Sequence, residues 1–566
     1  MFFLGNASGH DFQFHSASWL DASNQWREGI IFPRWAEWAN WGFGEPRFIF
    51  YPPASWMLGA ALGSVLPWKI VPGVFIWLTL VAAGMTMWRL AREWLTDSQA
   101  TAATVFFAAN PYHLVIVYYR SDFAELLASV FLPLLVLGVL RVARDGWGRV
   151  PMLAIAFAGI WLSNAPAAVI ATYSLVLLIA VGCLLQRTLR PLTTGGIAMA
   201  AGFGLAAFYI LPAAWEQRWV QIAQVLDTNL RPEQNFLYTK ALDPEFVLFN
   251  WKVSTVAMMV LLFAGVATVF AARRRKDFSE AWWALLALGA ASVLFMLPPS
   301  IFLWRLLPKL QFVQFPWRWL EPLCLVLAFF AAAASGDVGK TPLRRSAVWL
   351  VILVVFGAAG AAMARDAWWD SDDMTSLLEG IQSGHGYEGT DEYAPLGCDR
   401  YSLPGSGGDS GDVLDQTTSN SSDSFAAPPA TPRIAKYDAD SDSVVSASGV
   451  RIHVRQWSAE RRVFSADSPE AVTLAVRLLA YPAWEVRVDG AIVRVDSLPE
   501  TAQLLVPLSP GAHNVEIRFR RTWDRSLGAA ISLCSILALF ALSFFVRRAH
   551  HAPRQPKQEP VCIRWT

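Results

Sequence analysis

Apolar runs of roughly 20 residues, the length that crosses a bilayer as one helix, recur along the 566-residue chain. The runs cover residues 53–67, 69–92, 99–119, 121–142, 150–163, 165–185, 193–213, 252–272, 281–298, 316–335, 346–364 and 526–546. The first and the fifth are short for a span and are expected to be juxtamembrane or tilted pieces. Charged residues make up only 16% of the chain, against about 25% in soluble domains. The sequence therefore predicts a polytopic, mainly α-helical membrane protein.

Basic residues in the short loops indicate the orientation, because Lys and Arg gather on the cytoplasmic side of a membrane. The clearest cluster is Arg-Arg-Arg-Lys at 273–276, and others surround Arg187, Lys340 and Arg547. The sides alternate consistently only if 53–67 does not cross, which leaves about eleven transmembrane helices. The outer face is then expected to carry residues 1–68, the turns near 120 and 164, and residues 214–251, 299–315 and 365–525.

Composition and hydrophobic pattern divide the chain into five parts. They are a first outer-face loop with juxtamembrane helices (1–68), a transmembrane core (69–364), a flexible outer-face linker (365–446), an outer-face β-domain (447–522) and a final transmembrane helix with a cytoplasmic tail (523–566). The linker is predicted because residues 402–446 consist mainly of Ser, Asp, Gly, Thr, Pro and Ala. From 447 to 520 apolar and polar residues alternate, with turns at Asp489-Gly490 and Pro510-Gly511, which predicts a small antiparallel β-sandwich.

Charge and cysteine content exclude several classes of function. The 46 basic and 45 acidic residues give a net charge of +1, so the chain lacks the basic surplus of a nucleic-acid-binding protein. The five cysteines are scattered and form no CxxC pair, which argues against a disulfide framework and a structural zinc site. Neither a Walker loop nor a GxSxG motif occurs, so a nucleotide hydrolase or serine hydrolase has no support.

The first outer loop contains the first candidate site, formed by His10, Asp11 and His15. A carboxylate near the outer membrane surface can act as a general base on a sugar hydroxyl or bind a cation. Asp11 and His15 would share a face if this segment is helical. An ordinary solvated loop is the alternative interpretation of the same residues.

The second candidate lies in Tyr-Tyr-Arg-Ser-Asp-Phe-Ala-Glu at 118–125, which contains Arg120, Asp122 and Glu125. Glu125 falls one turn into an apolar run, and ionisable groups inside a span are costly and usually face a partner or a water-filled cavity. A purely structural Arg120–Glu125 pair that closes a helical hairpin is the alternative.

Two further groups of candidates follow where later spans reach the outer face. Arg318 lies between two indoles in Gln314-Phe-Pro-Trp317-Arg318-Trp, and arginine binds phosphate oxygens in a bidentate way. An aromatic belt with a snorkelling arginine explains the same segment without function. Glu216 is the first acid after the run 193–213 and is a candidate for positioning an acceptor or an arginine.

The ordered series of these motifs resembles a known bacterial family. "GHDFQFH", "GIIFPRW" and "FYPP" are similar to the first outer loop of the YfhO-like group of multi-pass proteins with the GT-C glycosyltransferase fold, and within it to the membrane proteins called "6-pyruvoyl-tetrahydropterin synthase-related". "YYRSDFAELLA", "AFYILPAAWE", "LPPSIFLWRLLP" and "QFPWRWL" resemble later motifs of that group in the same order, and "YPAWEVRVDG" and "PGAHNVEIRF" resemble its outer β-domain. The resemblance covers nearly the whole chain except 365–445. The pterin synthase itself resembles a soluble enzyme with a three-histidine zinc site, and the chain has no such cluster.

The resemblance implies a GT-C-type hexosyl- or pentosyltransferase in the bacterial inner (plasma) membrane, with its active site on the outer face. Such an enzyme takes a sugar from a polyprenyl-phosphate carrier and transfers it to a glycan, lipid or protein acceptor. An acid in the first outer loop is its catalytic base, and that position matches Asp11, with His15 or His10 as orienting groups. Arg120 and Arg318 would then hold the phosphate, while Asp122, Glu125, Glu216, Gln314 and Trp317 complete the substrate-binding set.

Three points remain open in this interpretation. Some GT-C enzymes bind a divalent metal at paired acids, but Asp11 has no adjacent acid, so no metal ligand is assigned. The family has a helix before the first outer loop, and one missing upstream helix is expected here, unless a short N-terminal tail crosses unaided. The alternative function is a non-enzymatic membrane scaffold or transporter in envelope polymer assembly. Transporters place their charges at mid-membrane, whereas the charges here gather at the outer ends of spans.

Overall fold

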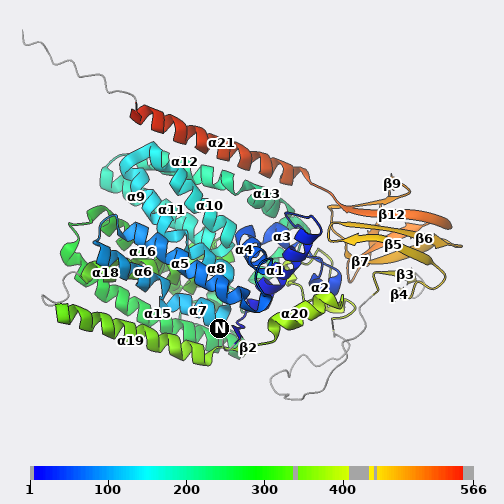
Figure 1. Cartoon of the computed structure of the whole chain (residues 1–566), viewed down its shortest axis with the longest axis horizontal. Helices are drawn as coiled ribbons and strands as arrows, with labels where there is room; N and C mark the ends of the chain where they lie inside the picture. Colours follow the sequence, from blue (N-terminus) through cyan, green and yellow to red (C-terminus); the bar gives the residue numbers. More distant parts are fainter. Residues whose placement is uncertain (1–4, 336–341, 407–431, 439–442, 552–566) are drawn as a thin grey trace, which may run out of the picture.

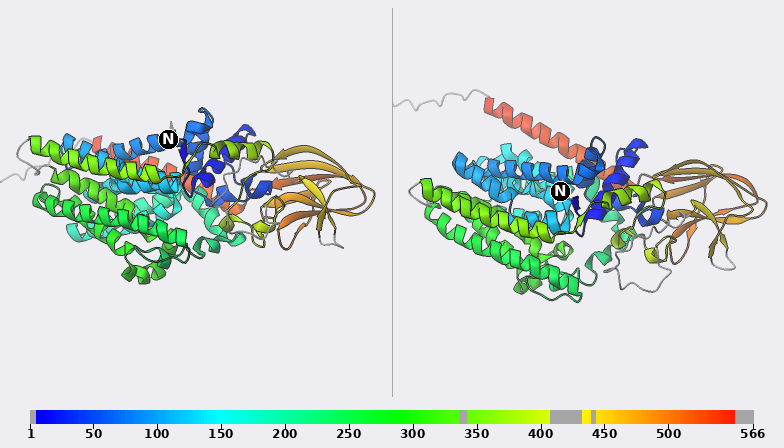
Figure 2. Two further views of the ribbon diagram at one scale, coloured as in Figure 1. Left: turned by 90° about the horizontal axis from the view of Figure 1, so that it is seen from below. Right: turned by 60° about the horizontal axis from the view of Figure 1, so that its bottom comes forward.

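The computed structural model describes residues 5–335, 342–406, 432–438 and 443–551 and consists of a helical body with a β-domain at one end (Figure 1). In both views of Figure 2 the strands extend from one end of the body, beyond the helices. The last helix, α21 (Trp523–His551), leads from the β-domain back along the body. The predicted fold class, a mainly α-helical multi-pass protein with a small β-sandwich, is confirmed.

Residues 5–68 contain short helices that do not span a bilayer. They are α1 (Phe12–Arg27), α2 (Ala39–Gly42), α3 (Arg47–Phe50) and α4 (Pro53–Gly63). At 1.5 Å per residue, the 11 residues of α4 extend about 16 Å, roughly half of a hydrocarbon core. Gly59 lets α4 pack on α1, because a Cβ there would lie 2.2 Å from the Trp19 ring. The run 53–67 therefore does not cross, as the predicted alternation of sides requires.

The helical body contains most of the predicted spans. Its helices are α5 (Val71–Ala91), α6 (Asp97–Ala108), α7 (Pro111–Val115), α8 (Phe123–Ser129), α9 (Leu132–Asp145), α10 (Val150–Ser163), α11 (Ala165–Gln186), α12 (Arg190–Leu205), α13 (Ala207–Glu216), α15 (Pro244–Ala271), α16 (Ser279–Met296), α18 (Leu320–Ala334) and α19 (Pro342–Asp366). The short helices α14 (Pro232–Asn235) and α17 (Ile301–Leu306) lie in connections. In the described part of the chain eight helices are long and apolar enough to cross a membrane, or nine if α12 and α13, bent by 72°, form one span.

With the bent pair α12–α13 counted as a ninth span, the difference from the eleven predicted helices has two sources. One of the eight candidates is the 41-residue stretch Phe123–Ser163, which at about 60 Å is twice the thickness of a bilayer core. Gly138 of α9 packs against Leu153 of α10 within this stretch, so it is a hairpin that contains two of the predicted runs. The other source is α19, which covers the predicted run 346–364 and is not among the eight.

Loops that the sequence predicts on the outer face lie together at the end of the body next to the β-domain (Figure 1). The strand β1 (Asn6–Ala7) pairs with β2 (Trp369–Asp370) across more than 360 residues of sequence. Gln314 Nε2 donates to the carbonyl of Val225 at 2.8 Å, which joins two further outer loops. The segments after α5 and at the end of α9 are also joined, since Arg141 and Arg144 both bind Glu93.

The β-domain consists of two five-stranded antiparallel sheets. One has the strand order β10-β11-β7-β3-β4 and the other β5-β6-β12-β8-β9. The strands are β3 (Ile434–Asp438), β4 (Ser443–Val445), β5 (Arg451–Ser458), β6 (Arg461–Ser468), β7 (Val472–Leu479), β8 (Trp484–Val488), β9 (Ala491–Ile492), β10 (Asp496–Ser497), β11 (Gln503–Leu508) and β12 (Gly511–Phe519). Buried residues of both sheets and of the first loop, among them Trp35 and Phe43, form one core. The predicted turn at Asp489-Gly490 has positive φ at both residues, 52° and 84°, the geometry that Asp-Gly favours in a hairpin.

The predicted linker over 365–446 is wrong for much of its length. It contains the ten-residue helix α20 (Asp373–Gln382) and the strands β2, β3 and β4. Residues near its middle are bound to the first loop, since the Thr390 backbone N–H donates to Glu45 at 3.0 Å. The β-domain accordingly begins at Ile434 rather than at 447. Residues 407–431, which hold most of the Ser- and Gly-rich sequence, and the tail from 552 lie outside the described residues.

Candidate functional site

Asp11 is held against the turn at Arg120 by its own backbone. The backbone N–H of Asp11 donates to the carbonyl of Arg120 at 2.8 Å, and that of His10 donates to Tyr119 at 3.3 Å. Gly9 permits this approach, because a Cβ at that position would lie 2.4 Å from the Tyr119 carbonyl oxygen. The motif Gly-His-Asp thus places a carboxylate at the end of a membrane-embedded helix, where α1 begins.

Ser121 connects the segment before α1 to the turn at Arg120 by hydrogen bonds. It has a left-handed backbone conformation, with φ of 54°, directly after a π-helical turn over Ile116–Arg120. Its hydroxyl donates to the Ala7 carbonyl at 2.5 Å and accepts the Gly9 N–H at 3.0 Å. Such π-helical turns are rare and often occur at functional sites. Here the turn directs Arg120 toward Asp11.

Arg120 is the centre of a buried ionic cluster that draws on three carboxylates. Its Nη2 lies 2.5 Å from Asp11 Oδ2 and 3.3 Å from Asp122 Oδ2, and its Nη1 lies 3.3 Å from Glu125 Oε2. The side chain of Asp11 is 34% exposed, whereas those of Arg120, Asp122 and Glu125 are buried. Asp11 is therefore the carboxylate of this group that a substrate can approach.

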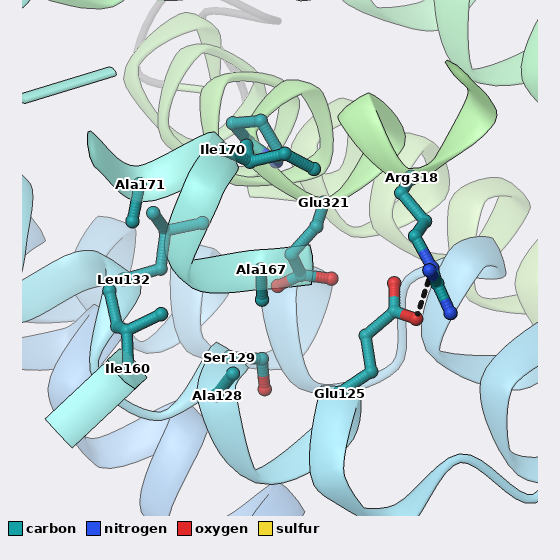
Figure 3. A pocket seen from close by; sticks show the side chains of 11 residues that line it. Glu125, Ala128, Ser129, Leu132, Ile160, Ala167, Ile170, Ala171, Arg318 and Glu321 are labelled. Atoms are coloured by element: carbon teal, nitrogen blue, oxygen red, sulfur yellow. Dashed lines mark hydrogen bonds and ion pairs between the residues drawn. The ribbon is translucent and has the colours of Figure 1, made fainter. Parts of the chain in front are cut away.

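Arg318 joins the cluster from a distant part of the chain. It lies in a tight helical turn over Pro316–Trp319, and its Nε donates to Glu125 at 3.1 Å (Figure 3). Its Nη2 lies 3.6 Å from Asp122, and its Nη1 donates to the Val313 carbonyl at 2.9 Å. We refer to Asp11, Arg120, Asp122, Glu125 and Arg318 as the Arg120 cluster.

Aromatic and amide groups complete the surroundings of the two guanidinium groups. The rings of Phe315 and Trp317 are stacked at 4.9 Å, and the guanidinium of Arg120 lies 5.6 Å and 5.3 Å from their centroids. Gln314 Oε1 lies 3.5 Å from Nη1 of Arg318. The structure thus brings the predicted residues Gln314, Trp317 and Arg318 to the same place as Asp11 and Arg120.

The two histidines do not orient Asp11 as predicted. His15 lies on α1, which confirms that the segment is helical, but its Nε2 lies 3.5 Å from Asp122 and not beside Asp11. The ring of His10 packs edge-on against Phe249 at 4.7 Å. Burial lowers the pKa of His10, so its imidazole is neutral at neutral pH. Arg120, rather than a histidine, fixes the carboxylate of Asp11.

A small cavity lies on the inner side of the cluster. Its volume is about 20 Å³, enough for about one water molecule, and its charged lining consists of Glu125, Arg318 and Glu321 (Figure 3). The remaining lining is mostly apolar and includes Leu132 and Ile170. Glu321 pairs at 3.1 Å with His113, so ionic contacts continue from the outer end into the bundle.

Several of these residues were not predicted from the sequence. Tyr112 donates its hydroxyl to Glu125, and neither Tyr112 nor Glu321 was among the predicted site residues. Glu321 could have been found, since it is an acid in the first turn of an apolar helix, the same signal that indicated Glu125. Tyr112 and Ser121 carry no comparable signal, because tyrosine and serine are common at such positions.

Glu216 does not belong to this site, which corrects its predicted role in substrate binding. Nε and Nη2 of Arg525, at the start of α21, bind its two carboxylate oxygens, each at 2.7 Å. The Tyr481 hydroxyl donates to it at 2.6 Å, and Thr522 Oγ1 lies 3.4 Å away. Because Glu216 is fully buried and its carboxylate oxygens already accept these hydrogen bonds, a substrate cannot bind to it. We refer to Glu216, Tyr481, Thr522 and Arg525 as the Glu216 clamp.

The donor set of the Arg120 cluster does not fit a divalent cation. Each of its carboxylates, Asp11, Asp122 and Glu125, is paired with a guanidinium group. A carboxylate that binds a metal ion must instead direct its oxygens to the cation, which a neighbouring guanidinium would repel. In the described parts of the chain no group of three or more His, Cys, Asp or Glu side chains is arranged to hold a metal ion.

Comparisons with known proteins identify relatives of this chain. An uncharacterized protein of Lactococcus lactis subsp. cremoris (strain MG1363) is 24% identical over 225 residues, which are 37% of this chain and 36% of that protein. Archaeal oligosaccharyltransferase AglB from Archaeoglobus fulgidus, solved with an inhibitory peptide and a dolichol-phosphate, is similar with a TM-score of 0.37 and 14% identity, covering 64% of this chain and 52% of AglB. A second Archaeoglobus fulgidus oligosaccharyltransferase structure, tethered to an acceptor peptide, gives a TM-score of 0.39 and 13% identity, covering 69% of this chain and 56% of that one. The chain thus spans about half the length of these enzymes and about a third of the Lactococcus protein.

The helical body and the β-domain define a polytopic membrane protein with a buried ionic cluster at one end of its helical bundle. The model of the family called "6-pyruvoyl-tetrahydropterin synthase related domain", a membrane protein family, matches residues 48–367, more than half of the chain. The chain belongs to this family, as the motif series in the sequence predicts.

Proposed function

We propose that this protein is a membrane glycosyltransferase. It transfers a sugar from a polyprenyl-phosphate carrier to a glycan, lipid or protein acceptor of the bacterial envelope, on the outer face of the plasma membrane. The observation that carries the proposal is the Arg120 cluster, where one partly exposed carboxylate touches a buried guanidinium group and a second guanidinium lies behind it. A base and a phosphate-binding pair are the two parts that such a transfer needs.

Asp11 is the general base in this mechanism. Its carboxylate takes the proton of an acceptor hydroxyl, and the resulting oxygen attacks the anomeric carbon of the donor sugar. The bond between that carbon and the phosphate oxygen breaks, and its electron pair leaves with the phosphate. Attack from the side opposite the phosphate inverts the anomeric configuration.

Arg120 and Arg318 stabilise the charge that develops on the leaving phosphate. Guanidinium groups bind phosphate oxygens with paired N–H donors, and burial strengthens this interaction because little water competes. Arg120 now binds Asp11 at 2.5 Å, so an arriving phosphate competes with Asp11 for Nη2. Binding of the donor therefore frees the base at the moment when it is needed.

Deletion of the gene in its host, followed by mass spectrometry of polyprenyl-phosphate sugars in lipid extracts, tests the proposal. The deletion strain and a strain complemented with Asp11→Asn should accumulate a lipid-linked sugar, whose mass names the donor. A strain with wild-type protein, or with the matched control Asp227→Asn at an exposed acid, should not. Full complementation by Asp11→Asn would exclude Asp11 as the base. An unchanged lipid profile in the deletion strain would instead favour a scaffold or a transporter.

A further inference from the structure

A second pocket, larger than the cavity at Arg318, lies between the first outer loop and the segment predicted as a linker. It has a volume of about 200 Å³ and is lined by Gln13, Asp373, Ser376, Leu377, Gly386 and Tyr387. Gln13 comes from α1, the next three residues from α20, and the last two from the loop after α20. Figure 1 shows α20 beside α1, at the end of the body that carries the β-domain.

The walls of this pocket are fixed by hydrogen bonds to α1 and α2. Asp21 of α1 accepts the Tyr387 hydroxyl at 2.8 Å and the Trp38 N–H at 3.1 Å. The Tyr387 N–H in turn donates to the Trp38 carbonyl at 2.9 Å. Gly386 has φ of 86°, and a Cβ there would lie 2.4 Å from the same carbonyl, so only glycine fits. A pocket held in this way is preformed, as ligand-binding pockets usually are.

The pocket is joined to the proposed base by the short segment 6–13. Gln13 is two residues beyond Asp11, in the first turn of α1. On the other side of the pocket, α20 follows β2, which pairs with β1, and the Ser8 N–H donates to the Trp368 carbonyl at 2.8 Å. The pocket and Asp11 thus share the first turn of α1, with Gln13 in the pocket lining and Asp11 at the start of the helix.

The lining indicates the chemistry of the ligand. The amide of Gln13 and the hydroxyl of Ser376 can donate to and accept from sugar hydroxyl groups, the carboxylate of Asp373 can accept from them, and Leu377 offers an apolar surface. None of the six lining residues is basic, so an anionic phosphate finds no counter-ion here. The volume is below the roughly 300–1,000 Å³ of pockets for drug-sized ligands, which suits one sugar ring.

We propose that the pocket formed by α1 and α20 binds the acceptor as a neutral sugar residue and presents one of its hydroxyl groups to Asp11. This inference rests on the proposed function and adds that the acceptor is a glycan or glycolipid. Arg120 and Arg318 would then hold the donor phosphate on one side of Asp11, and Gln13 and Asp373 the acceptor ring on the other.

Saturation-transfer NMR on the full chain in detergent tests the proposal without turnover. The probes are the methyl glycosides of glucose, galactose, mannose, N-acetylglucosamine and ribose, together with glucosamine as a cationic comparison. Wild-type protein should give signals with at least one neutral glycoside. Gln13→Ala with Asp373→Asn should reduce that signal several-fold, and Ser376→Trp, which fills the pocket, should abolish it.

Two controls make the outcomes distinct. Glu379→Gln, at an exposed acid of α20 outside the pocket, should bind like wild type. Asp11→Asn should also bind like wild type, even though it fails to complement the deletion strain. Signals that survive Ser376→Trp, signals from glucosamine alone, or no signal from any glycoside would overturn the acceptor site. If sugar binding follows the pocket variants while Asp11→Asn complements fully, the proposed function fails and the sugar site stands.

Discussion

Two of the buried ionic groups at this end of the molecule, the Arg120 cluster and the Glu216 clamp, differ in how completely the carboxylates that define them are paired. In the clamp the Glu216 carboxylate accepts hydrogen bonds from Nε and Nη2 of Arg525 and from the Tyr481 hydroxyl, and it is fully buried. In the cluster three carboxylates share two guanidinium groups, and Asp11 remains 34% exposed.

Under the proposed function, this difference distinguishes a structural ion pair from the catalytic site. A buried charge is tolerated only when hydrogen bonds and an opposite charge compensate it. Glu216 itself meets that condition, and its contacts connect α13 to β-domain residues and to the first turn of α21. The Arg120 cluster has one carboxylate more than it has guanidinium groups, and Asp11 is the carboxylate that solvent reaches. The proposed function assigns this charge to catalysis rather than to stability.

The largest expected effect is on stability and concerns the clamp. Arg525→Met leaves Glu216 as an uncompensated buried charge, which should lower the free energy of unfolding by about 3–5 kcal/mol. Thermal unfolding of the detergent-purified protein, followed by tryptophan fluorescence, measures the change. The matched control Arg521→Met, at a neighbouring exposed arginine, should stay within about 0.5 kcal/mol of wild type. Equal stability of the two variants would mean that the clamp is not structural.

A double variant sharpens this result. Glu216→Gln combined with Arg525→Met removes both charges, so it should be more stable than Arg525→Met alone, because the uncompensated carboxylate is gone. A double variant that is less stable than the single one would instead show that Glu216 is held mainly by Tyr481 and Thr522.

The second effect is on activity and concerns the cluster. Asp11→Asn should lower the transfer rate by about 10²–10⁴-fold, the contribution of a general base. The unfolding midpoint should barely change, because Arg120 keeps its contacts with Asp122 and Glu125. The rate is measured in membranes with the lipid-linked donor that accumulates in the deletion strain. A parallel loss of rate and stability would mean that Asp11, like Glu216, has a structural role.

A smaller effect is expected from Arg318→Lys. Lysine keeps the charge but loses the planar pair of donors, which should weaken donor binding by about tenfold, or roughly 1.4 kcal/mol. The KM for the donor should rise more than kcat falls. The matched control is Arg305→Lys, an exposed arginine at the same end, which should leave both parameters unchanged. An unchanged KM in Arg318→Lys would exclude Arg318 from the phosphate site.

The sequence predicts the elements of this molecule better than the partners of its charges. Apolar runs and alternating strands follow local periodicity, so the helices and the β-sandwich were predictable. Asp11, Arg120, Glu125 and Arg318 were also predictable as a group, because each lies where a span or loop reaches the same side. Glu216 met the same criterion, and nothing local reveals that Arg525, 309 residues away, would pair with it. The order in 369–406 was missed for a similar reason, since its helix depends on tertiary contacts with the first loop.

Another buried acid, Glu37, extends the comparison, and its effect depends on pH, with a slope of at most about 1.4 kcal/mol per pH unit for one titrating group. Glu37 is buried in the first loop near Arg462, which is itself fully buried. Burial raises the pKa of Glu37 to about 8, although Arg462 opposes the shift. Other charged groups that face it are Glu28, Asp21 and Arg433. The charge of Glu37 is thus compensated less completely than that of Glu216, because Arg462 is near it but does not cancel the effect of burial.

The pH dependence follows from the sign of this shift. The folded state keeps the Glu37 proton up to about pH 8, whereas the unfolded chain releases it near its ordinary value of 4.5, so stability falls as the pH rises between these values. Glu37→Gln removes this dependence. It should match wild type near pH 4.5 and unfold at a higher temperature near pH 8, with Glu379→Gln as the exposed control that shows no such difference. Equal midpoints for Glu37→Gln and wild type at both pH values would mean that Arg462 pairs with Glu37 as fully as Arg525 pairs with Glu216. Glu37 would then be compensated like Glu216, whereas Asp11 would remain the partly exposed acid that the proposed function uses as the base.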